Sequence, residues 1–127
     1  MIQANELRLN NYLHLDGGIY QVNEIYNRLQ CVELKRKNQS NPNLNEYEEC
    51  DLDYENLEPI EIKEDILFLL GFVDKGFGDW RKNRLYLSRE SKNHFVTNGF
   101  IIEIQFLHQL QNLYFAIHGE ELVFSLD

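Results

Sequence analysis

The clearest hydrophobic pattern in the sequence lies near the C-terminus, in FIIEIQFLHQLQNLYFAIHGEELVFSL. Ile101, Ile102 and Ile104 put apolar side chains on both faces of residues 100–106, which predicts a central β-strand. The apolar positions that follow recur with the 3.6-residue period of an amphipathic helix: Leu107, Leu110, Leu113, Tyr114 and Ile117. Gly119 is expected to end this helix, because glycine tolerates the left-handed conformation of a helix C-terminus.

Phe115 falls on the opposite side of the predicted helix, together with His108, Gln111 and Asn112. An aromatic ring on that face needs a second surface to pack on. We expect this surface to be the N-terminal part of the same chain, with a partner or a second copy as the alternative.

The N-terminal part alternates short apolar runs with turn residues, as in a β-meander. Strands are predicted at residues 12–15, at 19–25 and around 31–34. Asp16-Gly17-Gly18 supplies the first turn, and Asn27-Arg28 a weaker second one. An exposed, mobile loop is expected at 35–46, and an edge strand around Ile60 and Ile62 follows Pro59.

Residues 64–70 predict a short helix that is apolar all round after its first turn and therefore buried, with Gly71 as its stop. A second meander follows, with strands at 80–82, 85–87 and 95–96 and a polar turn near 91–93. The predicted fold class is α+β. An N-terminal SH3-like β-meander lobe spans residues 1–58, and a helix, an antiparallel β-meander and the C-terminal helix form a lobe at 59–127. The two lobes are expected to share one core.

Charge is concentrated in one window of the chain. The net charge is −9, and residues 46–65 contain ten acids and one base, so this window alone carries −9 and the rest is neutral. Such a window suits the basic groove of a protein partner. The partner candidates are the window's first acids and tyrosines together with the aromatic on the last helix: Glu46, Tyr47, Glu48, Glu49, Asp51, Asp53, Tyr54 and Phe115.

A basic and aromatic run at 80–92 supports an alternative, weak binding of single-stranded nucleic acid. Its candidates combine phosphate-binding cations with rings that could stack on bases: Trp80, Arg81, Lys82, Arg84, Tyr86 and Arg89. The acidic balance of the chain opposes this function, because phosphate neutralisation dominates such affinity.

No motif for catalysis or for a tightly bound metal is found. The four histidines lack metal-ligand spacing, and the glycines lack the pattern of a phosphate loop. Asp51, Asp53 and Glu55 begin like a calcium loop, but Asn56 and Ile62 occupy the positions of its glycine and last glutamate. A weak, nonspecific divalent-cation site in the acidic window stays open. We expect no enzymatic activity, catalytic residue or cofactor.

The cellular location is predicted from membrane-spanning and signal segments. No stretch approaches the roughly 20 apolar residues of a membrane span, and the first residues do not read as a signal peptide. The protein is therefore predicted to be cytoplasmic, where Cys31 and Cys50 are expected to be reduced. No membrane partner is expected, and the oligomeric state is left open.

Three segments carry a resemblance that covers most of the chain: ANELRLNNYL, KEDILFLLGF and NGFIIEIQFLHQLQNLYFAIHGEEL. In order and spacing they resemble a family of small uncharacterised proteins of Bacteroidetes genomes and of their phages and mobile elements. The resemblance implies no activity, cofactor or site residue, but it favours a protein-binding or accessory module of a mobile element. One departure is Lys63, where the family often has a threonine that would cap the helix.

Overall fold

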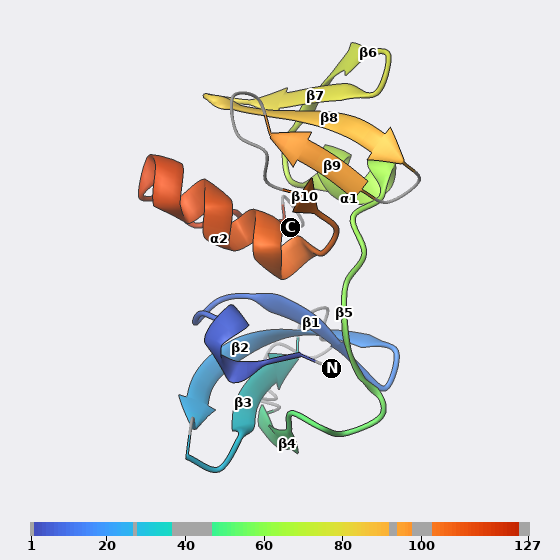
Figure 1. The fold of residues 1–127 in the computed structure, drawn as a ribbon. Coiled ribbons are helices and arrows are strands. Elements are labelled where there is room, and N and C mark those ends of the chain that lie inside the picture. The colour runs from blue at the N-terminus through green and yellow to red at the C-terminus, as the bar shows by residue number, and fades with distance from the viewer. Residues whose placement is uncertain (1, 27, 37–46, 92–93, 98–102, 125–127) are drawn as a thin grey trace. The chain divides into compact units, whose positions relative to one another are not determined.

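The computed structural model describes the chain except residues 1, 27, 37–46, 92–93, 98–102 and 125–127 (Figure 1). The chain divides into two compact units, Met1–Ile60 and Glu61–Asp127. The structure contains two antiparallel five-stranded sheets and one main helix, so it belongs to the α+β class. The first unit carries eleven acids and five bases and the second ten acids and seven bases, so their formal charges are −6 and −3.

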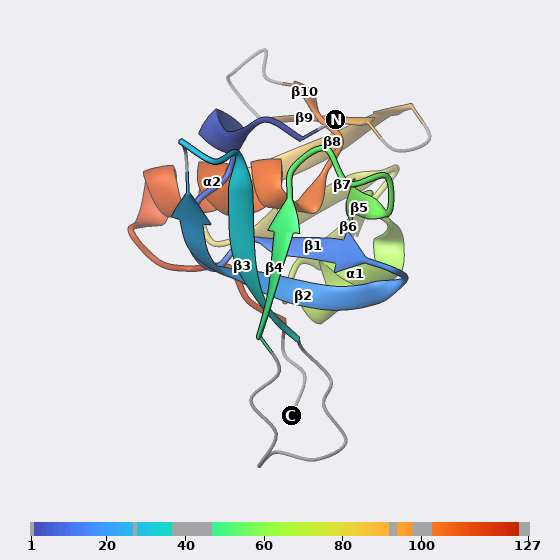
Figure 2. The same cartoon turned by 90° about the horizontal axis from the view of Figure 1, so that it is seen from below.

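The N-terminal unit is a short 3₁₀ turn followed by five strands. The turn is η1 (Ala4–Glu6), and the strands are β1 (Tyr12–Leu15), β2 (Gly18–Tyr26), β3 (Cys31–Arg36), β4 (Tyr47–Asp51) and β5 (Leu57–Pro59). Their order in the sheet is β4-β3-β2-β1-β5. Figure 2 shows β2, β3 and β4 running beside one another. The three strands predicted before residue 35 are confirmed.

Local chemistry explains the first hairpin. Asp16 and Gly17 connect β1 to β2, and their φ values are +50° and +82°. Two successive positive φ angles characterise the type I′ turn, whose twist matches that of the flanking strands. The inward side chains of the strands then form a core with Ile2, Ala4 and Leu7, which precede β1. Leu13, Val32 and Leu34 are fully buried in it.

Some of the N-terminal predictions need correction. Residues 37–46 of the expected loop lie outside the described part, but Lys35 and Arg36 belong to β3. The expected edge strand lies earlier, at Leu57–Pro59, and pairs with β1, so Pro59 is its last residue and not its start. At an edge, proline removes no hydrogen bond that the sheet needs.

The C-terminal unit contains two helices and a sheet. Its elements are α1 (Glu64–Leu69), β6 (Val73–Gly76), β7 (Asp79–Lys82), β8 (Leu85–Ser91), β9 (His94–Thr97), β10 (Glu103–Ile104) and α2 (Leu107–His118). The strand order is β10-β9-β8-β7-β6. The described part of the strand predicted at 100–106 is therefore an edge strand of this sheet and not a central one. The rest of that segment, 100–102, lies outside the described residues.

The predicted stop of the first helix is confirmed. Gly71 has a φ of +89°, and its N–H donates to the carbonyl of Phe68. The N–H of Phe72 donates to the carbonyl of Leu67, which completes a Schellman motif. The expectation that this helix is buried all round is wrong, because Phe68 is 73% exposed. A helix of only six residues packs one of its sides against the unit. Its opposite side faces water, whatever residues stand there.

The buried face of α2 differs from the predicted stripe by part of a turn. Leu107, Leu110 and Tyr114 are buried as predicted, but Leu113 is half-buried and Ile117 is 39% exposed. His108 and Gln111, predicted to lie on the outer face, are buried instead. The side-chain amide of Gln111 donates to the carbonyl of Leu122 at 3.1 Å, so the segment after the helix satisfies a polar group on its inner face.

Candidate functional site: an acidic surface on the N-terminal sheet

The acidic window contains an edge strand, β4, at residues for which the sequence analysis predicted no strand. β4 pairs only with β3 among the described strands, with Cys50 opposite Val32 and Glu49 opposite Glu33. Since side chains alternate between the faces of a strand, Cys50 and Glu48 lie on the core side and Glu49 and Asp51 on the outer side. The glutamates of this strand are exposed.

Three glutamates line up across the outer face of the sheet. Glu24 of β2 is opposite Glu33 of β3, and Glu33 is opposite Glu49 of β4. We call Glu24, Glu33 and Glu49 the acidic row. A β-bulge at Asn23 brings its side-chain amide to the same face, where it donates to the Glu33 carboxylate at 2.6 Å. Like charges directly opposite one another oppose sheet formation, so other contacts must offset this repulsion.

The charges of the acidic row affect the pKa of Tyr26. Its hydroxyl donates to the Glu24 carboxylate at 2.9 Å. This hydrogen bond, a desolvation effect and the charges of Glu24, Glu33 and Glu49 raise the pKa of Tyr26 to about 12. The phenol therefore stays protonated and continues to donate throughout the neutral range.

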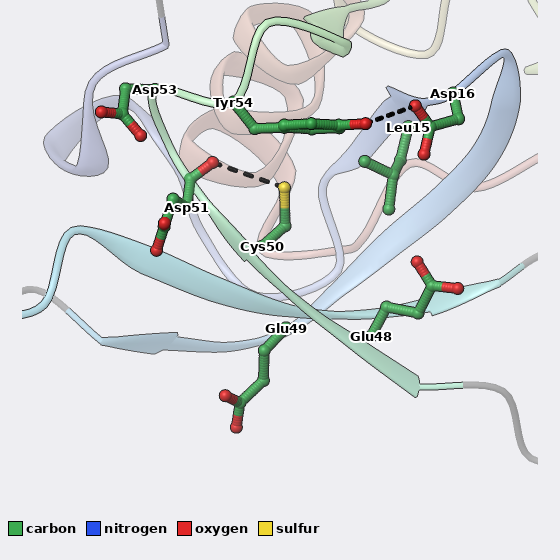
Figure 3. A pocket seen from close by; sticks show the side chains of 8 residues that line it. All are labelled: Leu15, Asp16, Glu48, Glu49, Cys50, Asp51, Asp53 and Tyr54. Carbon is green, nitrogen blue, oxygen red and sulfur yellow. Dashed lines mark hydrogen bonds between the residues drawn. The ribbon is translucent and has the colours of Figure 1, made fainter.

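A pocket of about 420 Å³ lies along the edge strand β4, is open to solvent and is lined by residues from both faces of that strand. Figure 3 shows its lining: Leu15, Asp16, Glu48, Glu49, Cys50, Asp51, Asp53 and Tyr54. The Tyr54 hydroxyl donates to the Asp16 carboxylate at 2.9 Å and so connects the turn after β1 with the segment after β4. Glu49 points away from Cys50, as strand alternation requires (Figure 3). We call this hollow the acidic pocket.

The pocket contains one thiol, that of Cys50, and the acidity of this thiol is lowered. Burial, followed by the charges of Asp51, Asp16, Glu48 and Asp53, raises the pKa of Cys50 to about 11. Burial and the nearby carboxylates also raise the pKa of Cys31. The two thiols are free. They occupy neighbouring strands at positions that differ by one register step, so they point to opposite faces of the sheet and cannot form a disulfide without rearrangement.

Alkylation tests the protonation state of Cys50. At pH 8.5 its reaction with iodoacetamide should be about 100-fold slower in the folded protein than in the protein unfolded in guanidinium, because the thiolate is the nucleophile. Mass spectrometry of the Cys50 peptide measures both rates, and rates within threefold of each other would contradict the raised pKa of Cys50.

The Cys50 thiol is a weaker acid in the folded protein than in the unfolded chain. The free energy of unfolding should therefore fall as pH rises from the ordinary thiol pKa of 9.0 through about 11.

Most of the sequence-predicted partner residues converge on this region. Glu48, Glu49, Asp51, Asp53 and Tyr54 line the acidic pocket. Tyr47 is exposed on the outer face of β4, with the Lys35 ammonium 5.9 Å from its ring centre.

The other partner candidates are placed differently. Phe115 lies on α2 in the other unit and is 40% exposed, whereas Glu46 lies outside the described residues. The sequence reading missed Asp16, Glu24 and Glu33, which lie outside the acidic window. The predicted hairpin gave no signal for Glu24 and Glu33, because a two-residue turn at Asn27-Arg28 would place Glu24 opposite Cys31 and not opposite Glu33.

The basic run predicted for nucleic acid is divided by the sheet. Trp80 is 6% exposed and packs inside the unit, so its ring offers no stacking surface to a base, and this candidate is corrected. Arg89 forms an ion pair with Glu64 at 3.1 Å. Arg81 lies directly opposite Tyr86, with its guanidinium 4.7 Å from the ring centre.

The other two candidate cations, Lys82 and Arg84, have different surroundings. The Lys82 ammonium donates to the carbonyl of Leu70 at the end of α1, at 2.6 Å. Arg84 is exposed in the turn between β7 and β8. Within its described part, the run therefore does not form one continuous strip of cations and rings.

Within the described residues nothing indicates an enzymatic activity. No group of three or more histidine, cysteine, aspartate or glutamate side chains that could hold a metal ion occurs there. The described helices include none with the length and apolar character needed to cross a membrane. No protein-family model, curated protein or solved structure matches the chain.

Proposed function

We propose that the chain is a non-enzymatic binding module and that its N-terminal unit binds a basic segment of another protein. The observation that carries this proposal is the acidic row, three glutamates held in register on one face of a sheet. The acidic pocket lies at the edge strand next to the row, so carboxylates are available on both sides of β4.

Physical chemistry favours a cationic partner for this surface. Each like-charged cross-strand pair costs on the order of 0.2–1 kcal/mol. Lysine or arginine side chains that lie over the row would relieve the repulsion and speed encounter through long-range attraction. β4 also has a free edge among the described strands, where an extended peptide could add main-chain hydrogen bonds.

Three finer interpretations belong to the same proposal. The strand order β4-β3-β2-β1-β5, with the last strand beside the first, supports an SH3-like arrangement of the N-terminal unit. The resemblance described above supports a role as an accessory protein of a mobile element. A cytoplasmic location is part of the proposal and is supported by two free cysteines that the sheet keeps apart.

Binding of a basic peptide tests the proposal directly. A fluorescein-labelled octapeptide of alternating lysine and arginine is titrated with the protein at low ionic strength, and anisotropy gives Kd. The triple variant Glu24→Gln/Glu33→Gln/Glu49→Gln should bind about 10-fold more weakly, because each lost surface charge pair is worth roughly 0.2–1 kcal/mol. Its melting temperature should stay the same or rise, since the substitutions remove repulsion.

A matched control separates the acidic row from net charge. Glu55→Gln/Glu58→Gln/Glu90→Gln removes the same charge from exposed positions outside the row and should change Kd less than threefold. If both triple variants lose affinity equally, the peptide responds to net charge only and the row is not the site. Failure of the wild-type chain to bind the peptide at 20 mM salt, a condition chosen to favour charge attraction, would also overturn the proposal.

Binding of single-stranded nucleic acid stays the alternative prediction. The support for this function is weak because Trp80 is buried. In addition, Lys82 contacts the Leu70 carbonyl and Arg89 pairs with Glu64. Arg81 and Tyr86 are the two candidates that share the outer face of the C-terminal sheet.

A further inference from the structure

A second pocket, in the C-terminal unit, has the opposite charge. It measures about 420 Å³ and is lined by Gly71, Val73, Lys75, Arg81, Lys82 and Asn83. Three of these six residues are cations, and none of the described residues that line it is acidic, although the unit as a whole is acidic. We call it the basic pocket. The sequence reading missed Lys75, which a β-bulge in β6 places at the pocket.

Lys82 is held in place by its neighbours. Its ammonium donates to the carbonyl of Leu70 at 2.6 Å and lies 5.5 Å from the ring centre of Tyr114. An ammonium carries three N–H donors, so two are left for another acceptor. Desolvation by burial lowers the pKa of Lys82, against an opposing effect of Glu120, which indicates that an additional anion nearby would be favourable.

Arg81 is held by a similar set of contacts. Its Nε donates to the carbonyl of Asn83 at 2.8 Å, and its guanidinium stacks over Tyr86. The side-chain amide of Asn83 in turn donates to the Tyr114 hydroxyl at 2.6 Å, so the turn that carries it is fixed to α2. The terminal nitrogens of Arg81 keep the planar pair of donors that suits the oxygens of a phosphate.

Lys75 completes the set from the edge strand. It is exposed, and within the part of the chain that the structure describes it has no ion-pair partner. Two fixed cations and a third at the rim thus surround one hollow. Cations placed together repel one another, and an anion between them would remove that repulsion.

We propose that the basic pocket binds a phosphate group, with Arg81 and Lys82 as fixed donors and Lys75 closing over the anion from β6. A pocket of this volume suits a small phosphorylated compound, since small-molecule sites measure about 300–1,000 Å³. This site is independent of the acidic surface of the N-terminal unit, so either proposal can fail alone.

Nuclear magnetic resonance titration of the full chain with sodium pyrophosphate tests the site. Saturable amide shifts are expected at Gly71, Val73, Lys75 and Asn83, with a Kd in the millimolar range or tighter at low salt. Arg81→Gln and Lys75→Gln should each raise Kd about fivefold or more. Lys82 is left intact, because its contact with Leu70 makes it part of the fold.

Arg84→Gln is the matched control, because Arg84 is an exposed cation of the neighbouring turn that does not line the pocket. It should change Kd less than twofold, and spectra of all variants without ligand should keep the wild-type dispersion. Shifts that do not saturate, or that sodium sulfate at equal ionic strength reproduces fully, would overturn a phosphate site. A second titration uses the oligonucleotide dT12. If dT12 binds more tightly than pyrophosphate and Arg84→Gln weakens dT12 binding, the assignment to a small ligand is wrong. The phosphate would then belong to a nucleic acid.

Discussion

Replacing Trp80 by alanine should destabilise the C-terminal unit by about 3–5 kcal/mol, the range for removing a large buried aromatic side chain. Trp80 lies on β7 opposite Leu87 and is 6% exposed. Its removal would leave a cavity that the neighbouring side chains cannot fill without moving. The cost combines the lost burial of the ring with the lost packing around the cavity.

Urea unfolding followed by circular dichroism measures this effect, since Trp80 is the single tryptophan and fluorescence would lose its probe. Tyr86→Ala is the comparison, because Tyr86 lies on the outer face of the same sheet and is half-buried. It should cost about 1 kcal/mol, mainly the contact with Arg81. Equal losses from the two substitutions would show that Trp80 does not occupy the core.

Leu110→Ala should destabilise the protein by about 2–5 kcal/mol, whereas Ile117→Ala on the same helix should cost less than about 1 kcal/mol. Leu110 is fully buried and Ile117 is 39% exposed. The two substitutions change helix propensity in the same direction and by similar amounts, so the difference between them reports packing.

The two α2 variants are compared by their urea midpoints at a common slope. The periodic pattern of the sequence assigns both residues to one stripe, so it predicts similar losses for both. A large loss with Ile117→Ala would support that original stripe and contradict the face that the structure buries. A small loss with Leu110→Ala would contradict the packing of α2 altogether.

The N-terminal hairpin was predictable because its turn is a local event. Asp16-Gly17 can adopt two positive φ angles at low cost, and the apolar alternation on either side then sets the register. β4 was not predictable in the same way. Its sequence, YEECD, has acids where a half-buried strand usually has apolar residues, and only its pairing with β3 makes it a strand.

The same contrast explains the sites. Acids of the window at 46–65 were expected to act together because they are close in sequence, and five of the named partner candidates do line one pocket. The acidic row joins Glu24, Glu33 and Glu49, which are far apart in the chain, so no local pattern reveals it. The basic pocket likewise joins Lys75 to Arg81 through a bulge, and alternation separates the run from Trp80 to Arg89 between two faces.

By itself, the sequence determined the elements whose causes are local: the α+β class, the first hairpin, the glycine stop of α1 and the helix before Gly119. Backbone preferences and periodicity act within a few residues, so they can be read from neighbours along the chain. Tertiary structure alone decided which side of α2 is buried, that β4 is a strand, and which charges face one another. Those outcomes depend on contacts between residues distant in sequence, and their energies exist only once strands have paired and helices have packed.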